Sequence, residues 1–147
     1  MIDVSIEAYL KLEDDAFLEL AVMLANYWIS RQSKIGLFPT YINGDWSKSA
    51  LVDNNADMIV DLIKLYEITE NENYLSSVLS CIKATAKYYP QTGWSSKLSI
   101  ESGAPRSSFC LIKYVGGALK GLLVAYEFLR NTKVIGNEVL QNLARDR

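Results

Sequence analysis

Apolar residues recur at helical spacing through most of the chain. Leu20, Leu24 and Trp28 follow one another at intervals of four, which is the spacing of one face of an α-helix. No convincing run alternates between apolar and polar residues with the period of two that indicates a strand. The pattern therefore predicts an all-α chain with helices over residues 15–31, 53–68, 72–89 and 109–129, and from Thr132 onward.

Helix ends are also marked in the sequence. Asp14, Asp53 and Asn71 stand just before apolar periodic stretches, where short polar side chains cap the first backbone N–H groups. Pro90 is expected to stop the helix that precedes it, since proline lacks the backbone N–H that a helix needs. Between residues 109 and 129 nearly every face is apolar, so we expect that helix to be buried all round.

The first half of the chain repeats itself at an offset of 57 residues. Tyr9 aligns with Tyr66, and at the same offset Glu13 aligns with Glu70. A further copy follows 60 residues later, where Tyr126 takes the place of Tyr66. A period of this length indicates a supersecondary unit that must stack on its neighbours to bury its apolar faces.

Short and long connections alternate between the predicted helices. Those after Ile68 and Leu129 are short, whereas those over 33–52 and 90–108 are close to twenty residues. Long connections in compact domains are uncommon and usually functional or disordered. Antiparallel helices joined in this alternating way place every long connection at the same end of the array.

Two phrases carry a resemblance to a known superfamily. The segments 65–75 and 32–39, Leu-Tyr-Glu-Ile-Thr-Glu-Asn-Glu-Asn-Tyr-Leu and Gln-Ser-Lys-Ile-Gly-Leu-Phe-Pro, resemble the helical-hairpin repeat of (α/α) toroids. This superfamily includes six-hairpin glycosidases, polysaccharide lyases and sugar epimerases. The resemblance implies outer helices at about 15–32 and 72–89, inner helices at about 53–68 and 109–129, and a substrate cup built from the long connections.

The chain accounts for only part of such a barrel. Six hairpins of 57 residues need roughly 340 residues, whereas this sequence has 147. We therefore expect a single helical-hairpin domain over 1–147 that forms about half of a toroid, either as part of a larger barrel or through self-association. The ends of such an array expose apolar faces unless they are capped.

The composition removes several classes of chemistry. The chain contains no histidine, which excludes Ser-His-Asp and Cys-His nucleophile systems and most zinc chemistry. We expect no metal and no cofactor. A formal net charge of −2 gives no basic footprint for nucleic acid, and no apolar stretch reaches the ~20 residues of a membrane span. No signal peptide is visible, so a cytoplasmic location is expected.

Three carboxylates form a stripe at the start of the first complete inner helix. Asp53, Asp57 and Asp61 are spaced four residues apart, so they lie on one helix face. The structural interpretation is an N-cap followed by a solvated face, with Lys64 neutralising Asp61. The functional interpretation places Asp53 and Asp57 at the floor of the cup, as the acid and base of a glycosidase or as hydrogen-bonding partners of a sugar.

Other polar and aromatic residues near the long connections are candidates for substrate binding. Exposed aromatic rings there could stack on sugars or pack the connections onto the helix ends, and a tyrosine beside a cation could serve β-elimination from a uronate. The candidates are Tyr41, Trp46, Asn54, Trp94, Arg106, Lys113 and Tyr114. Gly117 and Gly121, on the face of the next inner helix that matches the carboxylate stripe, indicate close approach of a neighbouring helix or room for a ligand.

The sequence thus predicts a carbohydrate-active protein of the (α/α)-toroid type. It would bind sugar at the long-connection face and, if it is an enzyme, act as a glycoside hydrolase or a polysaccharide lyase. The alternative is a non-catalytic helical-repeat module for protein interaction. That alternative predicts an exposed apolar patch on the side or ends of the array and no cleft lined by carboxylates and aromatic rings.

Overall fold

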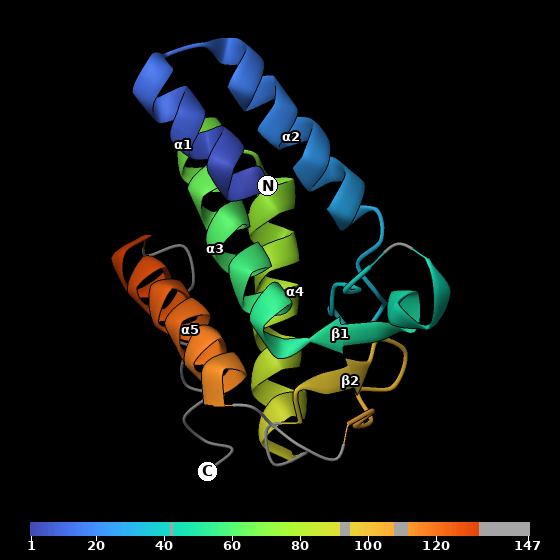
Figure 1. The fold of residues 1–147 in the computed structure, drawn as a ribbon. Helices are drawn as coiled ribbons and strands as arrows, with labels where there is room; N and C mark the ends of the chain where they lie inside the picture. The colour runs from blue at the N-terminus through green and yellow to red at the C-terminus, as the bar shows by residue number, and fades with distance from the viewer. Residues whose placement is uncertain (42, 92–94, 108–111, 133–147) are drawn as a thin grey trace.

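Helical hairpins dominate the computed structural model, which describes residues 1–41, 43–91, 95–107 and 112–132 (Figure 1). The prediction of an all-α fold is confirmed. Within the described residues there are five α-helices, a 3₁₀ turn η1 (Gly44–Lys48) and two short strands, β1 (Ser49–Leu51) and β2 (Lys97–Ser99). The helices are α1 (Ile2–Leu12), α2 (Asp15–Ile29), α3 (Val52–Thr69), α4 (Glu72–Gln91) and α5 (Ile112–Thr132).

The sequence repeat corresponds to a repeated hairpin turn. Helix α1 ends at Glu13 (φ 54°, ψ 31°), whose N–H donates to the carbonyl of Tyr9. Helix α3 ends 57 residues later at Glu70 (φ 53°, ψ 22°), whose N–H donates to the carbonyl of Tyr66. Both glutamates occupy the left-handed conformation that closes helix C-termini. The two copies therefore fold into the same kind of helix–turn–helix unit.

The residue after each of these glutamates caps the following helix, as predicted. The Asp14 carboxylate accepts from the N–H of Ala16, and the Asn71 side chain accepts from the N–H of Asn73. The cap predicted at Asp53 is wrong. Leu51 is the N-cap residue of α3 and offers no side-chain hydrogen bond, so Asp53 lies inside the first helical turn.

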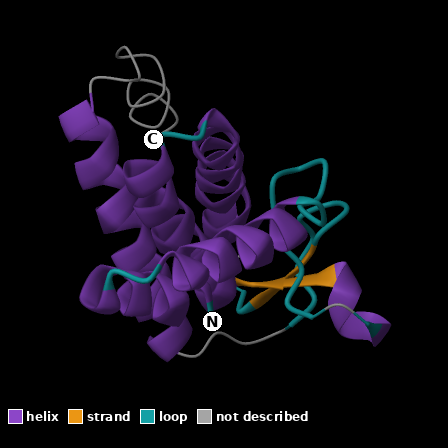
Figure 2. Ribbon diagram, turned by 90° about the horizontal axis from the view of Figure 1, so that it is seen from above, coloured by secondary structure: helices purple, strands orange, loops and turns teal. Residues whose placement is uncertain are grey.

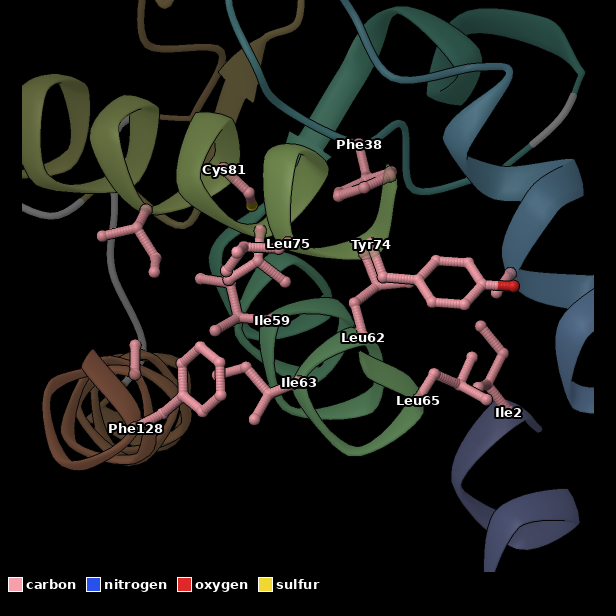
Figure 3. Close-up of a cluster of buried hydrophobic side chains, with 14 of the residues drawn as sticks. Ile2, Phe38, Ile59, Leu62, Ile63, Leu65, Tyr74, Leu75, Cys81 and Phe128 are labelled. Carbon is pink, nitrogen blue, oxygen red and sulfur yellow. The ribbon is translucent and has the colours of Figure 1, made fainter. Parts of the chain in front are cut away.

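Helix α3 lies at the centre of the described chain, against α4 on one side and α5 on another (Figures 1 and 3). Ile59, Leu62 and Leu65 on α3 are wholly buried. Tyr66 meets Phe128 of α5 edge to face, with ring centroids 5.7 Å apart. Most of the apolar surface that stabilises the fold is therefore gathered around this one helix.

The two long connections are joined by the small sheet. We call the connection between α2 and α3 the first connector and that between α4 and α5 the second connector. Strand β1 of the first pairs antiparallel with β2 of the second, with Ser49 opposite Ser99 and Leu51 opposite Lys97. Figure 2 shows the sheet beside the helices rather than between them. The described parts of both connectors thus lie at one end of the array, as predicted.

Three expectations about the helices need correction. Helix α4 includes Pro90 and ends at Gln91, one residue beyond the predicted stop. Helix α5 does not end at Leu129 but continues to Thr132, and the helix predicted after it lies outside the described residues. Nor is α5 buried all round, because Ile112, Leu119, Leu123 and Tyr126 are exposed.

The first connector needs a glycine where it passes α4. Gly36 has a φ of +96°, and a Cβ there would collide with the backbone carbonyl oxygen of Ser80. Only glycine adopts this conformation without strain and leaves room for the neighbouring backbone. The glycine in the repeated Gly-Leu phrase therefore holds the connector close against the helix. None of the described helices is long and apolar enough to cross a membrane.

Candidate functional site

A buried asparagine fixes the first connector to the start of α3. The Asn55 amide donates to the carbonyls of Phe38 (3.1 Å) and Leu51 (3.0 Å), and its side-chain oxygen accepts from the N–H of Phe38 (2.8 Å). The Cys81 thiol of α4 lies 3.5 Å from the same oxygen. Buried polar groups are costly unless they are bonded, and Asn55 satisfies both itself and the connector backbone.

The second connector is attached through the sheet and through Arg106. The N–H of Val52, the first residue of α3, donates to the carbonyl of Ser96 (3.2 Å). The Arg106 guanidinium donates to the carbonyl of Lys48 (3.2 Å), which lies just before β1. Arg106, a predicted substrate-binding residue, is exposed and ties the two connectors together.

The three carboxylates of the predicted stripe differ sharply in environment. Asp53 is half-buried and accepts from the N–H of its neighbour Asn54 (2.9 Å), whereas Asp57 is exposed. Asp61 retains only 8% of its exposure, and none of the described residues donates a hydrogen bond to its carboxylate. The stripe therefore runs from the connector end into the packed interior along one face of α3.

Partial burial raises the pKa of the Asp57 carboxyl above its ordinary value. The negative charge of Asp53 raises this pKa further, and the positive charge of Lys120 on α5 opposes the shift. A carboxyl whose pKa is raised beside a second carboxyl is suited to hold a proton while its neighbour is ionised. Asp53 and Asp57 therefore have the chemistry of an acid and base pair.

Burial also raises the pKa of Asp61, to about 6, and the negative charge of Asp3 adds to the effect. The expectation that Lys64 neutralises Asp61 is wrong. The Lys64 ammonium pairs with Asp3 (2.6 Å) and Glu7 (3.0 Å) on α1. Lys64 thus ties α3 to α1, and Asp61 lacks an ion-pair partner among the described residues.

Two glycines of α5 allow that helix to approach the carboxylate stripe. A Cβ at Gly117 would lie 3.2 Å from the Cβ of Asp53, and one at Gly121 would lie 2.7 Å from the Cβ of Ala56. Distances under 3.0 Å require the neighbouring atoms to move. The close approach predicted for these glycines is therefore present, and it is α3 that fills the space beside Gly121.

The remaining predicted residues are not gathered around Asp53 and Asp57. Lys113 is exposed and lies over the ring of Tyr114, 4.7 Å from its centroid. Tyr114 packs against a small apolar cluster that the connectors form with α4 and α5. In the described chain, no hydrogen bond or ion pair links Asp53 or Asp57 to Arg106, Lys113 or Tyr114.

The predicted aromatic residues of the connectors have mixed outcomes. Tyr41 is exposed in the first connector. The backbone of Trp46 lies in η1, but its side chain is outside the described part of the structure. Trp94 lies outside the described residues altogether. Stacking of connector aromatics on a sugar therefore rests, in the structure, on Tyr41.

Two hollows are found away from the carboxylate stripe. One of about 340 Å³ lies between α2 and α4, and one of about 400 Å³ lies at the turn between α1 and α2. Neither is lined by Asp53 or Asp57. The first is lined mainly by amides and hydroxyls, from Asn26, Ile29, Gln32, Asn73, Ser76, Ser77 and Ser80. Among the described residues, no group of three or more acidic or cysteine side chains is placed to hold a metal ion.

Sequence reasoning missed the residues that assemble the connector end. Asn55 occupies a position of α3 that faces the interior, between the buried Val52 and Ile59. A polar residue within an apolar helix stripe is the signal that could have identified it. Ser95 and Ser96 bond to Ser107 across the second connector (2.9–3.0 Å), and nothing in their spacing announces that contact.

Comparisons with protein-family models, with curated proteins and with solved structures found no match to this chain. The site must therefore be interpreted from its own geometry and charges.

Proposed function

We propose that this chain is a carbohydrate-active protein that binds sugar at the connector end of α3 and hydrolyses or eliminates glycosidic linkages there. One observation supports the proposal most. Both connectors meet at the first turn of α3, which carries Asp53 and, one turn later, Asp57. The resemblance to (α/α) toroids points the same way, because their substrate cup is formed by connectors of this kind.

The two carboxyls would divide the work of glycosidic cleavage. Asp57, whose pKa is raised by burial and by Asp53, would protonate the glycosidic oxygen as its bond to the anomeric carbon breaks. Asp53 would take the proton from the attacking water, or would itself attack the anomeric carbon and be released by water. The separation between the carboxyls decides between these two courses. Elimination from a uronate would instead use Tyr114 or Tyr41 as the base beside a cation.

The experiment compares Asp53→Asn and Asp57→Asn with the parent protein on a panel of neutral and uronate-containing oligosaccharides. Hydrolysis is followed by new reducing ends, and elimination by the ultraviolet absorbance of the unsaturated product. We expect either substitution to reduce turnover by at least 100-fold, as loss of a proton-transfer group does. Because Asp53 is not a cap, its amide variant should melt within a few degrees of the parent.

Glu67→Gln is the matched control, since Glu67 is an exposed carboxylate in the C-terminal half of the same helix. It should leave both turnover and melting unchanged. Binding or turnover that survives Asp53→Asn would contradict the proposal. A loss of turnover that only parallels a loss of stability would assign Asp53 a structural role.

A second candidate is a helical-repeat module that binds protein. It is favoured by the apolar side chains that α5 exposes at Leu119 and Leu123, and by the position of both hollows away from the carboxylates. Capture of a protein by the parent chain, undisturbed by Asp53→Asn and lost on Leu123→Asp, would favour this function over the first.

A further inference from the structure

Helix α5 exposes a row of apolar side chains at one end of the helical array. Leu119 is 54% exposed and Leu123 is 56% exposed, and Ile112 and Tyr126 continue the row. Their spacing of seven, four and three residues keeps them on one face of the helix. A row of this length on a surface helix indicates a face that is covered in the functional protein.

The equivalent row on α3 shows what such a face packs against. Sixty residues earlier, Ile59 and Ile63 take the places of Leu119 and Leu123, and both are buried. Ile63 points toward Phe128 of α5 (Figure 3), and Tyr66, the counterpart of Tyr126, meets the same ring. The α3 row is thus covered by the unit that follows it, and the α5 row faces the place of a following unit.

Helix α2 exposes a second row at the opposite end of the array. Met23 is 60% exposed, and Leu20 and Tyr27 lie on the same face. Fifty-seven residues later their places on α4 are taken by Ser77, Ser80 and Ala84.

Those α4 positions pack against the preceding unit. The Ser77 hydroxyl donates to the side-chain oxygen of Gln32 (2.7 Å), and the backbone of Ser80 lies against Gly36. Gln32 and Gly36 both follow α2 in the chain. The α2 row therefore faces the place of a preceding unit, as Val4 does on α1, where it corresponds to Asp61 on the α1-facing side of α3.

The two ends of the array also carry opposite charge. The α1–α2 hairpin, residues 2–29, has six acidic residues and one lysine, a net charge of −5. Helix α5 has three basic residues and one acidic residue, a net charge of +2. Opposite charges around apolar rows attract two such faces to each other and disfavour contact between two copies of the same face.

We propose that a second copy of this chain docks head to tail, with the α5 row of one copy on the α1–α2 face of the other. The contact continues between chains the stacking that α3 and α5 show within one chain. An interface of this heterologous kind generates a closed ring or an open filament, according to the rotation between copies. It does not depend on the carbohydrate proposal.

The test measures mass in solution by sedimentation equilibrium over a range of concentrations. The parent protein should show an average mass above the 16.5 kDa of one chain, rising with concentration and falling with added salt. Leu123→Asp removes the α5 face and Met23→Asp removes the α1–α2 face, so each variant alone should be monomeric. Leu119→Asp provides an independent second variant of the α5 face.

Mixing the two variants distinguishes head-to-tail docking from other arrangements. In an equimolar mixture of Leu123→Asp and Met23→Asp, one intact pair of faces remains, so we expect a dimer of twice 16.5 kDa. Leu10→Glu is the matched control. Leu10 is 56% exposed, like Leu123, but its counterpart on α3 is the exposed Glu67, so association should survive this change.

Three results would overturn the proposal. The parent chain could stay monomeric at all concentrations, which would also be the outcome if another segment of the same chain covered the α5 row. The mixture could remain at 16.5 kDa. Finally, Met23→Asp could leave association intact while Leu123→Asp abolishes it, which would indicate that two α5 faces meet. Circular dichroism of each variant verifies that the helices are retained.

Discussion

Helices α3 and α5 stand in the same register of the repeat but have opposite surroundings. Ile59 and Ile63 of α3 are buried, whereas Leu119 and Leu123 at the matching positions of α5 are more than half exposed. The residues are almost as apolar in one helix as in the other. The difference shows that burial in a repeat array depends on having a neighbour on both sides, and not on the hydrophobicity of the helix itself.

The polar positions of the two helices differ in a complementary way. Asn55 and Asp61 are buried in α3, and α5 has Val115 and Gly121 at the corresponding positions. Asn55 can stay buried because it anchors the first connector. Gly121 lets α5 come against α3. The central helix therefore holds its neighbours through specific polar contacts, and the outer one is held mainly by close packing.

The largest expected effect separates the two apolar rows. Ile59→Ala should lower the free energy of unfolding by about 2–5 kcal/mol, because it leaves a cavity in the core. Leu119→Ala, at the matching exposed position, should change the monomer by less than about 0.5 kcal/mol. Urea unfolding at a concentration where the protein is monomeric measures both. Equal losses would mean that the α5 row is covered within a single chain.

The buried carboxyl of α3 gives a pH-dependent effect of up to about 3 kcal/mol, the value of a two-unit pKa shift. In the unfolded chain Asp61 releases its proton near its ordinary pKa of 3.8, whereas in the fold its pKa is about 6. The folded protein therefore binds the extra proton between these pH values. Stability is lost as the pH rises through this window and stays reduced above it.

Asp61→Asn removes that dependence. At pH 7 the variant should be more stable than the parent, and the gain should disappear below about pH 4, where the carboxyl is protonated in both states. Chemical unfolding at pH 4 and pH 7 measures the difference, with the exposed Glu67→Gln as control. A change in stability that is the same at both pH values would show that the carboxylate is not penalised by burial.

The smallest effect tests the close approach of α5. Gly121→Ala places a Cβ 2.7 Å from that of Ala56, and such overpacking costs about 1–3 kcal/mol. Gly116→Ala, on the same helix, meets nothing within 4 Å and should stabilise the protein by up to ~1 kcal/mol through helix propensity. Thermal unfolding of the pair should move the two melting temperatures in opposite directions. A shift in the same direction would contradict the packing described for α5.

The hairpins could be predicted from the sequence because their signals are local. The apolar spacing of α2 and the caps at Asp14 and Asn71 depend on residues within one or two helical turns. The exposed row of α5 could not be predicted, since an apolar helix has the same pattern whether or not a neighbour covers it. Strands β1 and β2 are three residues each, too short for alternation to be visible.

The candidate site was predictable as a set of residue types and less so as an assembly. The spacing of Asp53 and Asp57 places them one turn apart on α3 without any tertiary information. The partners of Lys64 depend on how α1 crosses α3, which no local pattern encodes. Arg106 illustrates the same limit, because its bond to Lys48 joins residues 58 positions apart in the chain.

The small sheet has a consequence for the order in which the molecule forms and opens. Its strands are separated by the whole α3–α4 hairpin, so they can meet only after that hairpin has closed and its loop entropy has been lost. Three residue pairs then hold the tie between them. We expect amide hydrogens of β1 and β2 to exchange with solvent together and sooner than those of α3, so the end of the protein that carries Asp53 can open while the helical centre stays intact.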